Sequence, residues 1–253
     1  MTKQNMHIHS KYSWDCSKYG KMEIEEIAKI LAENGIQYGA ITDHIEFDRE
    51  PLPYVLTKFK IRNLEIDRVN EMYQGKVTLL KAVEISSPHL YKNKVEALNE
   101  LDLDFIMGSV HEIKMNAKTD HDKIHANYLY YSEMLKMVEA NQIDIVGHLD
   151  YITRYHGRCF SSYYQVSDLI AAIIEKNQII EINTSGKRRN NSDLFPSINK
   201  LCDYVVLGGQ NVTIGTDAHQ YDELLDNLEE AEHIASELNL KPVIYQKRKR
   251  IIL

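Results

Sequence analysis

The chain has few cysteines, and their number and spacing argue against two classes of protein. Only Cys16, Cys159 and Cys202 occur in 253 residues. Three scattered cysteines support neither a disulfide framework nor a zinc site built from cysteine pairs. We therefore expect reduced thiols without a structural bridge, which is typical of an intracellular protein.

Long hydrophobic runs and an excess of positive charge are also missing. No apolar run approaches the ~18 residues of a membrane-spanning helix, and the N-terminus lacks the apolar core of a signal peptide. We therefore expect a cytoplasmic protein without a membrane partner. The net charge of -7 argues against a nucleic-acid-binding protein, which usually carries a basic patch. The basic run 247–250 is expected to be a solvated tail.

What the chain does have is an alternation of apolar β-rich runs and helical patterns, which predicts a parallel sheet built from βα units. No repeat, low-complexity tract or Pro/Gly linker divides it, so we expect one domain over residues 1–253. Seven or eight βα units in a domain of this length favour an α/β barrel.

The expected elements cover most of the chain. The strands are predicted at 4–9, 37–43, 77–84, 104–110, 143–147, 178–183 and 211–215, with a weaker candidate at 242–245. The helices are predicted at 22–34, 56–73, 92–101, 125–140, 163–176, 193–203 and 221–238. Segments 45–55 and 112–124 are expected to be loops over one end of the barrel.

Histidines and carboxylates gather at the ends of these strands. His7 and His9 share one face of the first strand because side chains alternate with period two, and Asp217 and His219 repeat that spacing. In βα barrels the carboxyl ends of the strands build the active site. Imidazole and carboxylate groups converging there predict a centre for several divalent ions. The residues at the strand ends are His9, His44, Glu84, His111, His148 and Asp217.

Four short motifs resemble those of the polymerase and histidinol phosphatase (PHP) superfamily. They are His7-x-His9, Thr42-Asp43-His44, the histidine of Gly108-Ser109-Val110-His111, and Asp217-x-His219, with Glu84 and His148 in the expected order. The resemblance covers the chain from residue 6 to residue 219. It implies a distorted (β/α)7 TIM-like barrel that binds up to three divalent ions at the C-terminal ends of its strands. Histidine and carboxylate ligands accept Zn, Mn or Fe.

The resemblance also divides the ligands among the ions, with Glu84 as a bridge between the first two. The ligands are His7, His9, Glu84 and Asp217 for the first ion, Glu84, His111 and His148 for the second, and Asp15, His44 and His219 for the third. Some relatives have histidine where this chain has Asp15, so a surface-loop aspartate is the alternative there. The expected catalytic residues within this set are Asp15, His44, Glu84, Asp217 and His219.

Charge supports a phosphate substrate. Three divalent ions contribute about +6, and three carboxylates with one bridging hydroxide offset about four, which leaves about +2 for a phosphate dianion. The expected mechanism is in-line attack of a metal-bridging hydroxide on phosphorus. The resemblance is to the histidinol-phosphate phosphatase branch, which implies hydrolysis of L-histidinol phosphate in histidine synthesis.

Two arginines could hold the phosphate, because the guanidinium fork suits phosphate oxygens. Phosphatases of that branch carry a run similar to Glu181–Arg188, and Arg158 lies ten residues after His148. Each of Arg158 and Arg188 is either a phosphate ligand or an ordinary surface charge. His156 is a candidate for a substrate contact or for a partner of a metal ligand.

Other functions stay open. Superfamily relatives hydrolyse nucleotides, sugar phosphates or phosphotyrosine with similar ligands, and the fold does not choose among them. An amidohydrolase also begins with His-x-His on a barrel strand, but Glu84 and the Asp217-x-His219 pair favour the phosphoesterase. A metal-free structural or regulatory module is the third alternative, and retention of nine plausible ligands argues against it.

Overall fold

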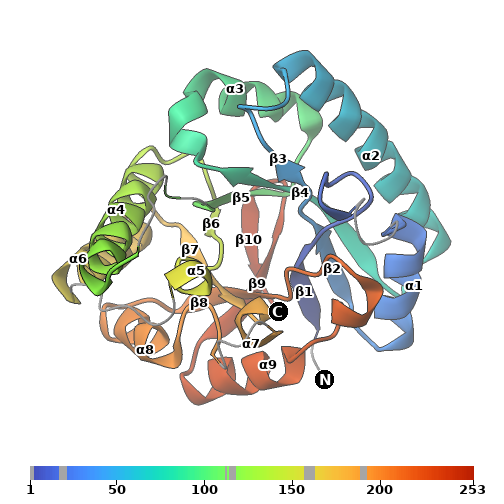
Figure 1. Ribbon diagram of the computed structural model, residues 1–253. Helices are drawn as coiled ribbons and strands as arrows, with labels where there is room; N and C mark the ends of the chain where they lie inside the picture. The colour runs from blue at the N-terminus through green and yellow to red at the C-terminus, as the bar shows by residue number, and fades with distance from the viewer. Residues whose placement is uncertain (1–2, 17–21, 112, 114–117, 157–162, 189–192) are drawn as a thin grey trace.

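The computed structural model describes residues 3–16, 22–111, 113, 118–156, 163–188 and 193–253. Within these ranges, parallel strands surround a common axis and helices lie outside them (Figure 1). All of the predicted strands form, and neighbours pair in parallel. In sheet order they are β1 (Gln4–Ile8), β2 (Tyr38–Ile41), β4 (Thr78–Ser86), β5 (Phe105–Ser109), β6 (Ile145–Val146), β7 (Ile179–Asn183) and β8 (Asn211–Gly215).

The first and last of these strands meet near their carboxyl ends. A bridge joins Ile8 to Ala218, and the backbone N–H groups of His9 and Asp217 donate to the carbonyls of Ala218 and His7 at 2.9 Å. At its amino end β8 pairs instead with β9 (Lys241–Gln246). The seven parallel strands therefore form a distorted TIM-like barrel, as predicted.

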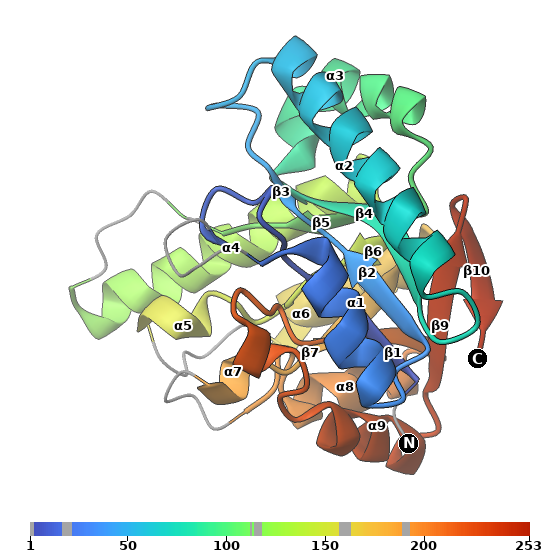
Figure 2. The same cartoon turned by 90° about the vertical axis from the view of Figure 1, so that its right-hand side faces the viewer.

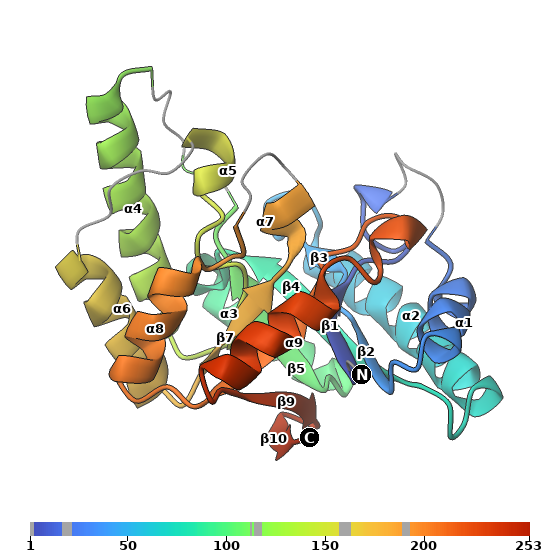
Figure 3. The same cartoon turned by 90° about the horizontal axis from the view of Figure 1, so that it is seen from below.

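A hairpin fills the amino-terminal end of the barrel. β10 (Lys249–Ile252) pairs antiparallel with β9, and the two strands lie at the end of the barrel opposite α5 (Thr153–His156) and α7 (Ser185–Arg188) (Figure 3). Apolar side chains from this hairpin and from the barrel strands form one buried cluster. Its members are Met6, Ala40, Leu80, Ala82, Phe105, Met107, Ile145, Ile179, Val243, Ile244 and Tyr245.

The basic run 247–250 is largely exposed, as predicted, but it forms the turn and the start of a hairpin strand and is not a tail. Lys247 and Arg248 form the turn, and their backbone N–H groups donate to Asp104. The Arg248 guanidinium pairs with Asp144. Asp104 and Asp144 lie more than a hundred residues before the basic run, so charge patterning along the chain could not reveal these contacts.

Helices cover the outer face of the strands. α1 (Ile24–Glu33) and α2 (Leu52–Met72) lie side by side near β1, β2 and β4 (Figure 2). α1 buries the apolar stripe that its period of 3.6 residues predicts. The other helices are α3 (Lys92–Ala97), α4 (Asp120–Glu139), α6 (Tyr163–Glu175), α8 (Ile198–Val206) and α9 (Leu228–Glu237).

Two helices begin earlier than predicted and shorten the expected loops. α2 begins at Leu52 and has Pro53 in its first turn. A proline is tolerated there because its missing N–H would have no intrahelical partner. α4 begins at Asp120, where the Thr119 hydroxyl and the Asp122 carboxylate form a reciprocal capping box. In the described part of the chain, no helix combines the length and apolar character needed to cross a membrane.

Candidate metal centre

Glu84 lies at the centre of the strand-end cluster and is fully buried on β4. Its Oε1 lies 2.9 Å from His111 Nε2 and 2.8 Å from His148 Nε2. Its Oε2 lies 3.2 Å from His7 Nε2 and 3.1 Å from His44 Nδ1. The short strand β3 (His44–Ile45) pairs with β4 and places His44 directly opposite Glu84. One carboxylate therefore contacts imidazoles from four segments of the chain, with two on each oxygen.

The histidines of β1 reach this cluster through an irregular strand. The pairing of β1 with β2 shifts register between Asn5 and Ile8. As a result Met6 joins the apolar cluster inside the barrel, while the next side chain, His7, contacts Glu84. His9 follows on the same side, as the period-two argument predicts.

His7, His9 and Asp217 form the first group of donors. The two Nε2 atoms lie 3.0 Å apart, and Asp217 Oδ1 lies 3.5 Å from His7 Nε2 and 3.2 Å from His9 Nε2. The second nitrogen of each ring faces another partner: His7 Nδ1 lies 2.8 Å from Glu181 Oε1, and His9 Nδ1 lies 3.0 Å from Ser13 Oγ. Such outer partners fix the ring orientation of metal-binding histidines.

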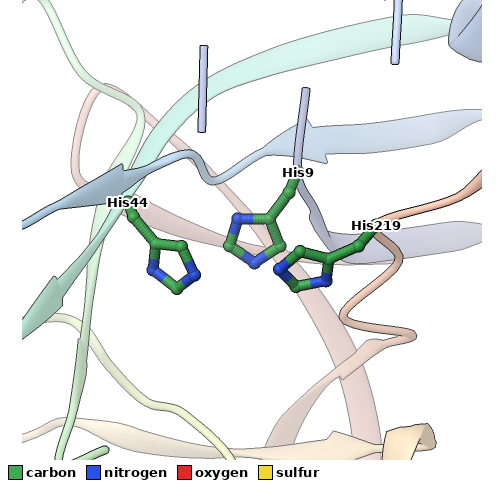
Figure 4. Close-up of side chains that lie close together, drawn as sticks. All are labelled: His9, His44 and His219. Carbon is green, nitrogen blue, oxygen red and sulfur yellow. The ribbon is translucent and has the colours of Figure 1, made fainter. Parts of the chain in front are cut away.

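The rings of His9, His44 and His219 lie side by side, with His9 in the middle (Figure 4). The ring centroid of His9 lies 4.3 Å from that of His44 and 4.2 Å from that of His219. Asp15 Oδ2 lies 3.3 Å from His44 Nε2 and 2.9 Å from His219 Nε2. Asp15 therefore belongs to the cluster and is not an isolated surface-loop aspartate.

Four residues in contact with the cluster were missed from the sequence. Glu46 groups with His44 and His111, and its position two residues after His44 was an available signal. Glu181 interrupts the apolar run of β7, which was also a signal for a buried carboxylate. Ser13 and Tyr151 had no sequence signal. The Tyr151 ring lies 4.6 Å from that of His148, centroid to centroid.

The carboxylates determine which imidazoles are protonated in the metal-free protein. Burial alone lowers the pKa of His111, but Glu84 and Glu46 outweigh it and raise the pKa to about 10. Burial likewise opposes protonation of His219, yet the contact with Asp15 raises its pKa to about 9. Both rings are therefore in the positively charged, doubly protonated form at neutral pH.

The same balance holds the carboxylates ionised. Burial raises the pKa values of Glu84 and Asp217, but the surrounding histidines keep both well below their usual range. Within the described residues, the ion-pair partners of these two side chains are all histidines. Buried carboxylates facing buried imidazoles form a mixed nitrogen and oxygen donor set, which suits Zn, Mn or Fe. The residues fit bound divalent metal ions.

Metal uptake should release protons, because an imidazole must be neutral to donate its lone pair. His111 and His219 have raised pKa values of about 10 and 9, so both are protonated at pH 7.5 without metal. His7, another expected ligand, also has a pKa well above its usual value, because its burial is outweighed by three carboxylates, those of Glu181, Asp217 and Glu84. We therefore expect release of at least two protons per protein and tighter metal binding as the pH rises from 6 to 8, by up to about tenfold per pH unit for each proton displaced. Calorimetric titration of metal-free protein with Zn²⁺ in buffers of different ionisation enthalpy measures this release. A heat independent of the buffer would contradict the assignment.

The predicted phosphate-binding residues are placed only in part. Arg188 ends α7 close to the cluster, and its Nη2 donates to the carbonyl of Asp217 at 2.9 Å. Its Nε lies 3.5 Å from Glu223 Oε1 and its Nη1 lies 3.7 Å from Asp226 Oδ2. His156 is the last residue of α5, and its side chain lies outside what the structure describes. Arg158 lies outside the described residues.

Comparison with known proteins places this arrangement in a family. Residues 5–185 match the family model of the PHP domain. Two proteins named "Probable histidinol-phosphatase" are similar along nearly their whole length. The one from Clostridium acetobutylicum is 28% identical, with 96% of each chain covered. The one from Thermotoga maritima is 27% identical, with 98% of this chain and 97% of that chain covered.

A solved structure shares the fold. The histidinol phosphate phosphatase of Lactococcus lactis, crystallised with Zn, L-histidinol and phosphate, superposes with a TM-score of 0.78. The alignment covers 99% of both chains at 19% sequence identity. Together with the family match over most of the chain, the barrel and its strand-end donors lead to one conclusion. The chain belongs to the PHP domain family.

Proposed function

We propose that this protein is a metal-dependent phosphomonoesterase that hydrolyses L-histidinol phosphate to L-histidinol and phosphate. The observation that carries the proposal is the buried cluster of donors around Glu84, whose carboxylate contacts four histidines. Its full-length relatives named histidinol-phosphatase support the choice of substrate.

The family resemblance implies that these donors hold up to three ions of Zn, Mn or Fe. His7, His9, Glu84 and Asp217 would hold the first, Glu84, His111 and His148 the second, and Asp15, His44 and His219 the third. Bound divalent ions supply the positive charge that holds phosphoryl oxygens and makes water nucleophilic at neutral pH. Glu84 would be shared by the first two ions.

The described cysteines do not offer a nucleophile. Cys16 is buried beside Asp15, and burial raises the pKa of its thiol, which keeps it protonated. Cys202 lies on α8, on the outer layer of the barrel. We therefore propose water as the nucleophile, activated by the divalent ions that the imidazole and carboxylate groups would hold. We infer a cytoplasmic enzyme with a small phosphomonoester as its partner and no nucleic acid.

A substrate panel on metal-reconstituted protein tests the function. L-Histidinol phosphate should have the highest kcat/KM, above nucleotides, sugar phosphates and phosphotyrosine. A kcat/KM at least tenfold higher for another phosphomonoester would support the phosphatase activity but contradict the proposed substrate. Absence of phosphate release from every compound would overturn the proposal as a whole.

Arg188 should contribute to phosphate capture. Its Nε and Nη1 are buried and make no hydrogen bond within the described residues, although they lie 3.5 Å from Glu223 Oε1 and 3.7 Å from Asp226 Oδ2. Phosphate oxygens would therefore compete with these two carboxylates for the guanidinium. Replacing it by alanine should leave metal content intact and lower kcat/KM roughly ten- to a hundredfold, because bonds to charged groups contribute ~1.5–3 kcal/mol. Lysine should rescue only partly, since a point charge cannot reproduce the guanidinium fork.

Inhibition by inorganic phosphate should weaken in parallel, because the product uses the same donors. Arg68→Ala is the matched control, since Arg68 is exposed on α2 and pairs with Glu25 of α1. Arg158→Ala and His156→Ala should be measured separately in the same assays. An Arg188→Ala enzyme with normal kcat/KM and normal phosphate inhibition would assign Arg188 to its contacts with Glu223 and Asp226 alone.

A further inference from the structure

We propose that Glu181 is a positioning residue that sets the geometry of two metal positions at once. It is fully buried on β7. Its Oε1 accepts a hydrogen bond from His7 Nδ1 at 2.8 Å. Its Oε2 accepts from the backbone N–H of His148 and from Asn183 Nδ2, both at 3.0 Å. The carboxylate therefore touches a side chain of the first donor group and the backbone of the second.

The contact with His7 fixes the tautomer of that ring. An ionised carboxylate only accepts hydrogen bonds, so Nδ1 must carry the proton. The lone pair of His7 is then on Nε2, which lies 3.2 Å from Glu84 Oε2 and 3.5 Å from Asp217 Oδ1. The nitrogen that faces the other donors is thus the one able to bind a metal ion.

The contact with His148 fixes a strained backbone. His148 has a φ of 24°, which residues with a side chain rarely adopt. Such conformations persist where surrounding contacts hold them. The bond from its N–H to Glu181 Oε2 is one of those contacts, and it directs the ring so that Nε2 lies 2.8 Å from Glu84 Oε1.

The neighbouring strands leave space for this carboxylate. A Cβ added at Gly215 on β8 would lie 2.3 Å from Glu181 Oε1 and 2.4 Å from His7 Cβ. No side chain fits there without displacing one of the two. Asn183 is also fixed, because its Oδ1 accepts from the N–H of Ser185 at 2.9 Å and its amide must turn Nδ2 towards Glu181.

Glutamine cannot replace Glu181 in this surrounding. If its amide oxygen faces His7, its NH2 group meets the N–H of His148 and the Nδ2 of Asn183, and donors oppose donors. If the amide is reversed, its NH2 group faces His7 Nδ1 and favours the tautomer with the proton on Nε2. That tautomer has no lone pair on the nitrogen directed at the metal position.

A measurement on the unaltered protein tests the first half of the proposal. Two-bond ¹H–¹⁵N spectra of the Zn²⁺-reconstituted enzyme report the tautomer of each imidazole. We expect His7 to carry its proton on Nδ1. A proton on Nε2 would overturn the proposal, whichever phosphate ester is the substrate.

Zn²⁺ affinity tests the second half. Glu181→Gln should bind Zn²⁺ about ten- to a hundredfold more weakly in competition with a chelator, and at more than one position. Asp104→Asn is the matched control, because Asp104, like Glu181, accepts hydrogen bonds on both carboxylate oxygens. Its donors are the backbone N–H groups of Lys81 at 2.9 Å and Lys247 at 3.0 Å, at the opposite end of the barrel. It should bind Zn²⁺ as the unaltered protein does. Gly215→Ala should weaken binding as Glu181→Gln does. Unchanged Zn²⁺ affinity in Glu181→Gln, or an equal loss in Asp104→Asn, would refute the positioning role.

Discussion

Replacing Glu84 by glutamine should remove more than one metal ion and lower phosphatase activity roughly 10³-fold or more. Glu84 contacts His7 and His44 through one oxygen and His111 and His148 through the other. Glutamine has the same size as glutamate, but its side chain has a single accepting oxygen and no charge. The first and second positions should therefore both lose affinity, which elemental analysis of the purified variant measures.

His44→Asn is the comparison for this result. His44 contacts Asp15 and Glu84, and the proposed ligand set gives it to a single ion. We expect His44→Asn to lose less metal and less activity than Glu84→Gln when both are assayed at saturating metal. Equal residual activity and equal metal content in the two variants would argue against a bridging role for Glu84.

Complete removal of metal should abolish activity. The described donors include buried carboxylates whose charged partners are histidines, and phosphate carries two further negative charges. Chelation should lower the rate of phosphate release to less than about 1% of its starting value, since water is a poor nucleophile at neutral pH without a bound metal. Stepwise addition of Zn²⁺, Mn²⁺ or Fe²⁺ should restore it.

The protein as purified should contain more than one equivalent of transition metal, because too many donors converge for a single ion. Elemental analysis before and after chelation gives the number. Full activity in a preparation without detectable metal would reject the mechanism. Restoration by only one of the three metals would identify the ion that the centre uses.

The strand-end donors were predictable because the strand period of two and the alternation of strands and helices determine where they lie. His7 and His9 share a side of β1, and the βα alternation places the ends of distant strands together. Asp15 was less certain because it follows no strand, and only its contacts with His44 and His219 placed it in the cluster. A loop residue has no period from which its direction can be read.

The hydrogen bonds around the donors were not predictable in the same way. The register shift in β1 depends on how its neighbour packs, and the positive φ of His148 depends on the turn after a two-residue strand. Glu181 was visible in the sequence as a polar residue within an apolar run and as the start of the run that ends at Arg188, but neither signal indicated its partners. Its partners lie 174 residues and 33 residues away, and a pattern along the chain does not specify such pairs.

The joining of β1 to the segment after β8 has a consequence for synthesis in the cell. Asp15 and His219 are 204 residues apart in sequence, and the bridge between Ile8 and Ala218 brings the first and last strands of the barrel together. A ribosome makes the chain from its N-terminus, so His7 and His9 emerge long before Asp217 exists. His7 and His9 therefore remain without Asp217 until β8 and the segment after it have left the exit tunnel. Closing so long a loop is slow, and any metal captured before then would bind only a partial site.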